Sequence, residues 1–162
     1  MKQIPAEVID FLRTQDFVIV SSIDKNGFPH GSCKSIVKIN PVGKIYLVDV
    51  YSGVTSENIK CNQHISISAV DEQKFIGYCL KGKARKMPDD FISQEVIKTW
   101  EENITSRLAK RLLRNLAQGQ GQRHHPEAGL PPPKQLIVLE VGKIVNLAPY
   151  HLRKPADSSQ GR

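Results

Sequence analysis

The sequence has few cysteines and no arrangement of them that builds a site. Cys33, Cys61 and Cys79 are the only three among 162 residues, and an odd number without a repeating spacing is a poor disulfide framework. The absence of any Cys-x-x-Cys pair disfavours a zinc site. We therefore expect each cysteine to behave as a small buried apolar side chain.

Long apolar segments are also missing. No apolar run approaches the ~20 residues that cross a bilayer, and the first residues lack the apolar core of a secretory signal peptide. These features predict a cytoplasmic protein with no membrane partner. Hydrophobic residues make up 40% of the chain and charged residues 24%, as in an ordinary globular domain.

Several motifs that carry chemistry are absent. The chain contains no Gly-rich phosphate loop, catalytic-triad motif or His-Glu-x-x-His motif. His124 and His125 lie in a Gly- and Pro-rich segment without carboxylates or cysteines at a set spacing, so we expect no metal site. The net charge of +7 favours anionic partners. We interpret the basic clusters at 83–86 and 107–114 as solvated faces rather than as a nucleic-acid interface.

Most of the remaining sequence has the features of short β-strands joined by tight turns. β-Branched residues dominate 17–23, and Asn26-Gly27 predicts a hairpin turn. Gly77 and Gly82, inside a predicted strand, indicate a bulge, a sharp bend or close approach of a ligand. Strands that follow one another this closely favour an antiparallel sheet or barrel over βαβ units. The further strands are expected at 29–39, 44–50, 64–70, 75–85 and 135–145.

Three segments are predicted to be helical. The first spans 5–13, and Thr55 caps the second, at 55–61. From residue 88 onward, apolar residues recur every four positions, a spacing that drifts around a helix of 3.6 residues per turn. We expect a break at 103–106 that divides this region into two helices.

These elements are expected to form one domain at 1–150. Its helical insertion spans 88–117 and is followed by a Gly- and Pro-rich loop at 118–134. Residues 151–162 are polar and are expected to form a mobile tail.

Three motifs resemble the FMN-binding split-barrel family, the relatives of pyridoxamine 5'-phosphate oxidase. Residues 21–30 are similar to the family's strand, D-x-x-G-x-P-H and strand opening. Residues 55–62 resemble its short helix with an N-I/L-x-x-N signature, and 77–85 resemble its G-x-A strand. The closing strand at 137–147 also fits. The order and spacing of these pieces, over more than half of the chain, make the resemblance fairly specific.

The resemblance implies a mainly β fold with helical additions: an antiparallel split β-barrel that forms a homodimer. It implies one FMN in each of two clefts between the subunits. A helix start offers free N–H groups and a positive dipole end to the phosphate, and Lys34 is the natural counter-charge. The residues expected to bind the cofactor are Ser32, Cys33, Lys34, Ser35, Val48, Asp49, Thr55, Ser56 and Asn58.

The sequence departs from the oxidases at the phosphate. The oxidases carry basic residues at the positions matched by Ser32, Val54 and Thr55, and none of these is basic here. This departure disfavours true pyridoxamine-phosphate oxidase activity. The sequence instead resembles the smaller flavin-binding members, which have a threonine at the position of Thr55. We expect neutral hydrogen bonds, the helix end and Lys34 or Lys38 to hold the phosphate.

The resemblance points to an FMN-dependent oxidoreductase of unknown substrate, with a small-molecule electron donor or acceptor. In such a protein the flavin supplies the electron chemistry, and the chain binds and orients it. Alternatives remain open: a non-catalytic flavin-binding electron carrier, a barrel that binds haem or a deazaflavin, or a module that holds nucleic acid. On spacing alone, Thr55 and Asn58 fit somewhat better as a helix cap and an exposed polar residue than as cofactor-binding residues.

Overall fold

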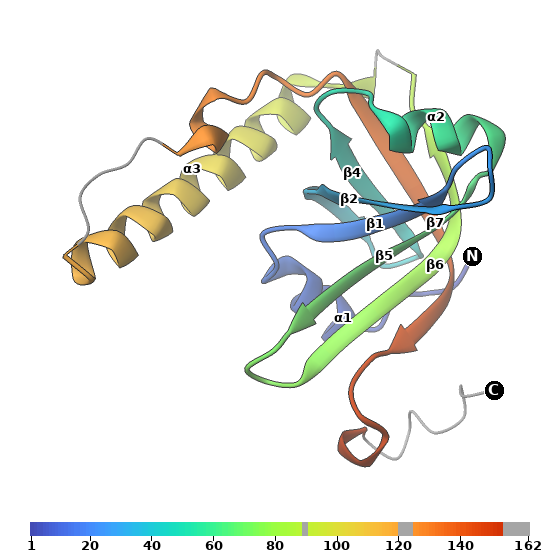
Figure 1. Ribbon diagram of the computed structural model, residues 1–162, viewed down its shortest axis with the longest axis horizontal. Coiled ribbons are helices and arrows are strands. Elements are labelled where there is room, and N and C mark those ends of the chain that lie inside the picture. Colours follow the sequence, from blue (N-terminus) through green and yellow to red (C-terminus); the bar gives the residue numbers. More distant parts are fainter. Residues whose placement is uncertain (89–90, 120–124, 154–162) are drawn as a thin grey trace.

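A computed structural model describes residues 1–88, 91–119 and 125–153. Its centre is one seven-stranded antiparallel sheet that curls into a half-barrel, with α1 and α2 on opposite sides of it and the long α3 projecting away (Figure 1). The helices are α1 (Ala6–Arg13), α2 (Val54–Cys61) and α3 (Gln94–Ala117). The strands are β1 (Val18–Ile23), β2 (Pro29–Lys34), β3 (Ile36–Asn40), β4 (Lys44–Asp49), β5 (His64–Asp71), β6 (Ile76–Lys86) and β7 (Gln135–Asn146).

The two edge strands of the sheet are neighbours in the chain. The strand order is β2-β1-β5-β6-β7-β4-β3, and only Ser35 separates β2 from β3. The chain therefore passes from one edge of the sheet to the other at Ser35, whose carbonyl accepts a hydrogen bond from Val48 N–H at 3.0 Å. The covalent backbone itself joins the two edges of the curled sheet.

The prediction of a single strand at 29–39 is therefore wrong. The segment divides at Ser35, so that β2 pairs with β1 and β3 pairs with β4. A strand that continued without a break would follow only one of these partners and would leave the other edge unpaired.

The inside of the half-barrel is the main hydrophobic core. Val18 and Val20 of β1 are buried there, whereas Ile19 between them is 52% exposed, as the alternation of side chains along a strand requires. The amphipathic α1 contributes Val8 and Leu12 to the same core. The predicted first helix and the half-buried character of these strands are confirmed.

The helical region differs from the prediction of two helices with a break at 103–106. α3 is one continuous helix of 24 residues, and the Ser93 hydroxyl caps its start by accepting a hydrogen bond from Val96 N–H. Neither glycine nor proline occurs within it, and the weak helix formers in the middle are insufficient to end a helix. The four-residue drift instead carries the apolar stripe off the barrel: Trp100 is buried, whereas Leu116 is 59% exposed.

The expectation for the cysteines is confirmed at only one position. Cys79 is buried, but Cys33 and Cys61 are exposed, and all three are free thiols. Cys33 lies on the outer face of the edge strand β2 and Cys61 is the last residue of α2. At these two positions, on the outer face of an edge strand and at the end of a helix, no other part of the chain covers the side chain.

Of the segments predicted after α3, the loop contains a short 3₁₀ turn, Pro126–Gly129. Most of the predicted tail, 154–162, lies outside the described residues. None of the helices in the described part of the chain is both long and apolar enough to cross a membrane.

A bulge between β6 and β7 makes Gly82 the most constrained glycine of the sheet. The register shifts between Lys81 and Gly82, and a Cβ at Gly82 would lie 1.9 Å from the Glu140 carbonyl oxygen. A bulge is one of the roles predicted for this glycine, and the close approach of the Glu140 backbone requires the absence of a side chain here.

We predict that Gly82→Ala lowers the free energy of unfolding by about 2–3 kcal/mol, because the bulge must open to admit the methyl group. Gly142→Ala, on the facing strand, is the matched control, since its Cβ would meet nothing closer than the Lys81 carbonyl oxygen at 3.7 Å. Urea denaturation of both variants measures the difference. Equal loss of stability in the two would contradict the constraint on Gly82.

Candidate functional site

A buried ion pair connects two strands that are not neighbours in the sheet. Lys34 is the last residue of β2 and Asp49 the last of β4. Lys34 Nζ lies 2.9 Å from Asp49 Oδ1, and the two side chains are only 8% and 4% exposed. The pair thus links an edge strand to the far side of the sheet, inside the half-barrel.

The first turns of α2 are fixed to this pair and to the neighbouring strands. Ser56 Oγ donates to Asp49 Oδ2 at 2.6 Å. The hydroxyls of Thr55 and Ser32 lie 2.8 Å apart, and Asn58 Nδ2 donates to Ser22 Oγ at 3.0 Å. Side chains near the start of one helix therefore bond to β4, β2 and β1. We call these side chains the polar cluster: Ser22, Ser32, Lys34, Asp49, Thr55, Ser56 and Asn58.

The electrostatics of the polar cluster favour an ionised Asp49. Burial alone would raise the pKa of this carboxyl group, but the hydrogen bonds from Ser56 and Lys34 and the charge of Lys34 outweigh it, so the pKa lies below its usual value. The Lys34 charge is correspondingly compensated by a carboxylate. The sequence predicts that Lys34 is the counter-charge of a bound phosphate. In the structure its charge is instead paired with Asp49, and Lys34 helps to hold β2 against β4.

The start of α2 retains hydrogen-bonding capacity. No side chain caps it, and Gly53 at the N-cap accepts the N–H groups of Ser56 and Glu57 through its carbonyl. Among the described residues, no hydrogen bond uses the backbone N–H groups of Val54 and Thr55. A helix start with free N–H groups is an anion site by its geometry and dipole, and the half-buried Ser32 hydroxyl lies beside it.

The structure does not bring every predicted site residue into the polar cluster. Cys33 points to the opposite, exposed face of β2. Val48 packs in a second apolar cluster with Trp100 of α3. Lys38 is exposed, with its Nζ 6.0 Å from the centre of the Tyr46 ring.

Ser35 lies at the crossover between the edge strands and is 8% exposed. The break in the strand at Ser35 separates it from Ser32, which lies on β2.

Sequence reasoning missed Ser22, which is 1% exposed and accepts the hydrogen bond from Asn58. A signal was available in the alternation of β1. Val18 and Val20 face the core, so the next inward position is Ser22, a polar residue on a buried face. Buried hydroxyls almost always have a partner, and this one marks the place where α2 docks.

The chemistry of the polar cluster fits a phosphate that is held by neutral donors. It offers backbone N–H groups and hydroxyls, and its single cation is already paired with Asp49. Within the part of the chain that the structure describes, no three His, Cys, Asp or Glu side chains are placed to hold a metal ion; His124 lies outside that part.

The family of the chain follows from comparison with known proteins. The family model described as pyridoxamine 5'-phosphate oxidase matches residues 4–147, which include every strand of the half-barrel and the whole polar cluster. The chain belongs to this family. No curated protein sequence matches it.

Solved structures share the fold at low sequence identity. HupZ from Group A Streptococcus is 22% identical with a TM-score of 0.62, over 90% of this chain and 94% of that one. A protein from Clostridium acetobutylicum, related to general stress protein 26 of B. subtilis and of the pyridoxinephosphate oxidase family, is 18% identical, with a TM-score of 0.54 over 91% and 95% of the two chains. An F420 reductase is 14% identical, with a TM-score of 0.54 over 88% and 98%.

These likenesses confirm the predicted fold, an antiparallel sheet curled into the split-barrel arrangement of the family with helical additions. The structural relatives have different names. Because their sequence identities to this chain are low, the comparison shows a shared fold and does not show a shared function.

We predict that Asp49→Asn lowers the free energy of unfolding at pH 7 by about 3 kcal/mol, because it leaves the buried Lys34 charge uncompensated. The pKa of Asp49 is lower in the folded than in the unfolded protein, so its contribution is complete above the unfolded value of 3.8 and is lost as the pH falls through the folded value.

The difference between wild type and Asp49→Asn should therefore shrink below about pH 4. Urea denaturation across this pH range measures it, with Asp10→Asn, an exposed site on α1, as the control. A difference that stays constant down to pH 2 would show that the charge of Asp49 does not matter.

Proposed function

We propose that this protein binds FMN and acts as a flavin-dependent oxidoreductase. The observation that carries the proposal is the start of α2, where the N–H groups of Val54 and Thr55 have no hydrogen-bond partner among the described residues and the hydroxyls of Thr55 and Ser32 lie 2.8 Å apart. Membership of the pyridoxamine 5'-phosphate oxidase family supports it. The FMN phosphate would accept hydrogen bonds from these groups and receive no direct charge from Lys34.

In this proposal the chain positions the cofactor rather than taking part in covalent chemistry. When bound, the flavin supplies hydride or electron transfer. Asp49 and Ser56 keep α2 in place, and Thr55 and Ser32 hold the phosphate end. We assign no acid or base residue, since transfer of hydride from a reduced nicotinamide requires none.

We further propose a homodimer with the flavin between the subunits. The outer face of β1 and β5 supports this, because it exposes the apolar side chains of Ile19 (52%) and Val70 (63%). A second copy of the chain would remove these side chains from water. Light scattering of the purified protein measures the mass directly, and a monomer at micromolar concentration would contradict this part of the proposal.

We predict that the wild-type protein binds FMN and that Thr55→Val weakens binding by about tenfold, the value of one neutral hydrogen bond. Valine retains the shape of the buried Thr55, so the fold is preserved. Thr105→Val, at an exposed position of α3, is the matched control. Quenching of flavin fluorescence measures the affinity, and circular dichroism checks the fold.

Equal FMN affinity in Thr55→Val and wild type would contradict the assignment of the phosphate site. No binding of FMN by the wild type would contradict the cofactor, and a purified protein with the spectrum of haem or a deazaflavin would replace it. Steady-state oxidation of a reduced nicotinamide separates the oxidoreductase from an electron carrier, which would show little turnover.

A further inference from the structure

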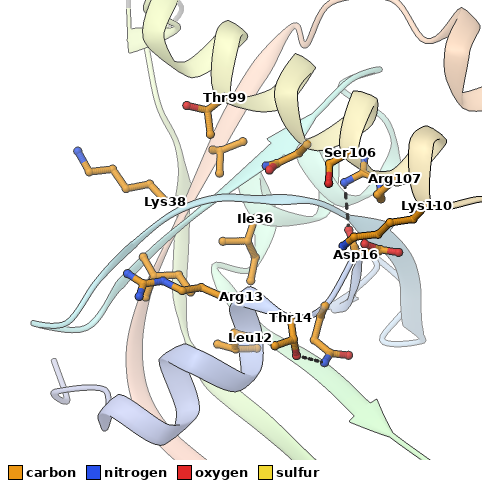
Figure 2. Close-up of a pocket in the computed structure, with 14 residues that line it drawn as sticks. Leu12, Arg13, Thr14, Asp16, Ile36, Lys38, Thr99, Ser106, Arg107 and Lys110 are labelled. Atoms are coloured by element: carbon orange, nitrogen blue, oxygen red, sulfur yellow. Dashed lines mark hydrogen bonds between the residues drawn. The ribbon is translucent and has the colours of Figure 1, made fainter.

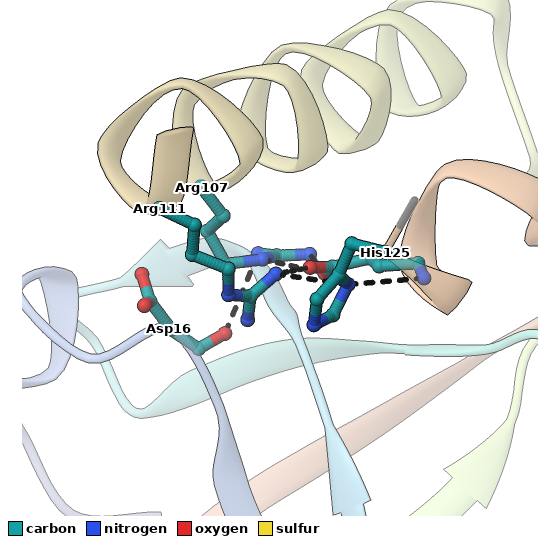
Figure 3. A network of polar contacts seen from close by, with 5 residues as sticks. Asp16, Arg107, Arg111 and His125 are labelled. Atoms are coloured by element: carbon teal, nitrogen blue, oxygen red, sulfur yellow. Dashed lines mark hydrogen bonds and ion pairs between the residues drawn. The ribbon is translucent and has the colours of Figure 1, made fainter. Parts of the chain in front are cut away.

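The two basic segments of the sequence, 83–86 and 107–114, have different surroundings in the structure. On α3, Arg107 and Arg111 both pair with the buried Glu127 (Figure 3). Burial alone would raise the pKa of Glu127, but the two arginines outweigh it and hold the pKa below its usual value. These charges are therefore internal to the fold, and they tie α3 to the 3₁₀ turn that follows it.

The other two cations of the α3 segment, Lys110 and Arg114, are exposed and form no ion pair in the described part of the chain. Lys110 lines a cleft between α1, β3 and α3, and Asp16 supplies a carboxylate to the same lining (Figure 2). Two of the four cations of this segment are thus compensated within the fold, and a third shares a cleft with a carboxylate.

The segment on β6 differs, because its outward-facing positions are all cationic. Leu80 and Ala84 belong to the main core, so the alternating positions Lys81, Lys83 and Arg85 point outward. All three are exposed. Because every second residue of a strand is about 6.6 Å further along, the three side chains form a line of positive charge about 13 Å long.

A fourth cation extends this line onto β7, which lies beside β6 (Figure 1). Lys143 is exposed and is the cross-strand partner of Lys81. Like charges that stand directly opposite each other on neighbouring strands are destabilising. The carboxylate of Glu140 stands opposite Lys83, but the cation within ion-pairing distance of it is Lys44, at 4.0 Å.

We call these four cations the basic row: Lys81, Lys83, Arg85 and Lys143. None of them forms an ion pair with any of the residues that the structure describes. The fold therefore tolerates a repulsive arrangement here that it compensates on α3.

The side chains next to the basic row supply hydroxyl groups. Ser66 of β5 is the partner of Lys81 on its other side, and Ser21 of β1 is in turn the partner of Ser66. Lysine, arginine and serine are residue types that contact the phosphate oxygens of nucleic acids. The row contains neither an exposed apolar side chain, which a bilayer surface would take up, nor an aromatic one, on which unpaired bases would stack.

We propose that the basic row binds the phosphate backbone of double-stranded DNA without sequence preference. A duplex carries one charge per about 1.7 Å of its axis, so about eight phosphates accompany the row's length of about 13 Å. Contact with them replaces the repulsion between Lys81 and Lys143 by attraction, and the net charge of +7 favours the approach of a polyanion. The surface is separate from the proposed flavin site, because none of its residues belongs to the polar cluster.

Titration of a short, fluorescently labelled DNA duplex with the full-length protein tests the proposal, with anisotropy as the readout. We expect saturable binding with the same affinity for unrelated sequences. Each phosphate contact contributes about −0.9 to the slope of log K against log salt, so four contacts predict a slope of about −3.6. Lys81→Gln/Lys83→Gln should reduce the slope to about −1.8 and weaken binding about tenfold at ~0.1 M salt.

Lys98→Gln/Lys110→Gln is the matched control, because it removes the same charge from exposed positions of α3, and it should leave the slope unchanged. In urea denaturation, Lys81→Gln/Lys83→Gln should be at least as stable as the wild type, since it relieves the repulsion from Lys143. Weaker binding of this variant is then a loss of contacts and not of fold.

Absence of saturable binding at low salt, an unchanged slope in Lys81→Gln/Lys83→Gln, or equal weakening by the two double variants would each overturn the proposal. Binding of the wild type to vesicles of anionic lipid, without binding to the duplex, would also overturn it and would assign the basic row to a membrane surface.

Discussion

Lys34 and Asp49 lie on strands that the sheet order separates widely, and inside the half-barrel their charged atoms are 2.9 Å apart. One residue later, at Ser35, the chain leaves one edge of the sheet and joins the other. The covalent crossover and the ion pair together close the barrel at this end. α2 docks onto this end of the barrel through Ser56, which bonds to Asp49, and Thr55, which bonds to Ser32. The proposed phosphate site therefore depends on the meeting of the two sheet edges.

Much of this architecture can be predicted from the sequence because it depends on local patterns. The alternation of β1 and the Asn26-Gly27 turn, where Gly27 has φ +87°, depend on neighbouring residues. The break at Ser35 cannot be predicted in the same way, since alternation does not change when a strand changes its partner. The continuity of α3 was also missed, because its apolar stripe leaves the barrel while the helix goes on.

The candidate site shows the same division. Short motifs indicate the residues at the start of α2, and the structure brings Thr55, Ser56 and Asn58 into one cluster with β1, β2 and β4. Sequence alone does not show that Asp49 compensates Lys34, since these residues are 15 positions apart and meet only through the fold. That pairing occupies Lys34, one of the groups expected to hold the phosphate, and leaves the neutral hydrogen bonds and the helix end.

The protein thus keeps buried charges in ion pairs, Lys34 with Asp49 and Arg107 with Glu127, and the groups of the proposed phosphate site lie beside the first of these pairs. Buried pairs of this kind contribute defined geometry more than net stability. The most direct test is a crystal structure of the protein with FMN. The account predicts a phosphate within hydrogen-bonding distance of the Thr55 N–H group and the Ser32 hydroxyl, with the Lys34–Asp49 pair intact. A phosphate bound to a Lys34 that has left Asp49 would contradict it.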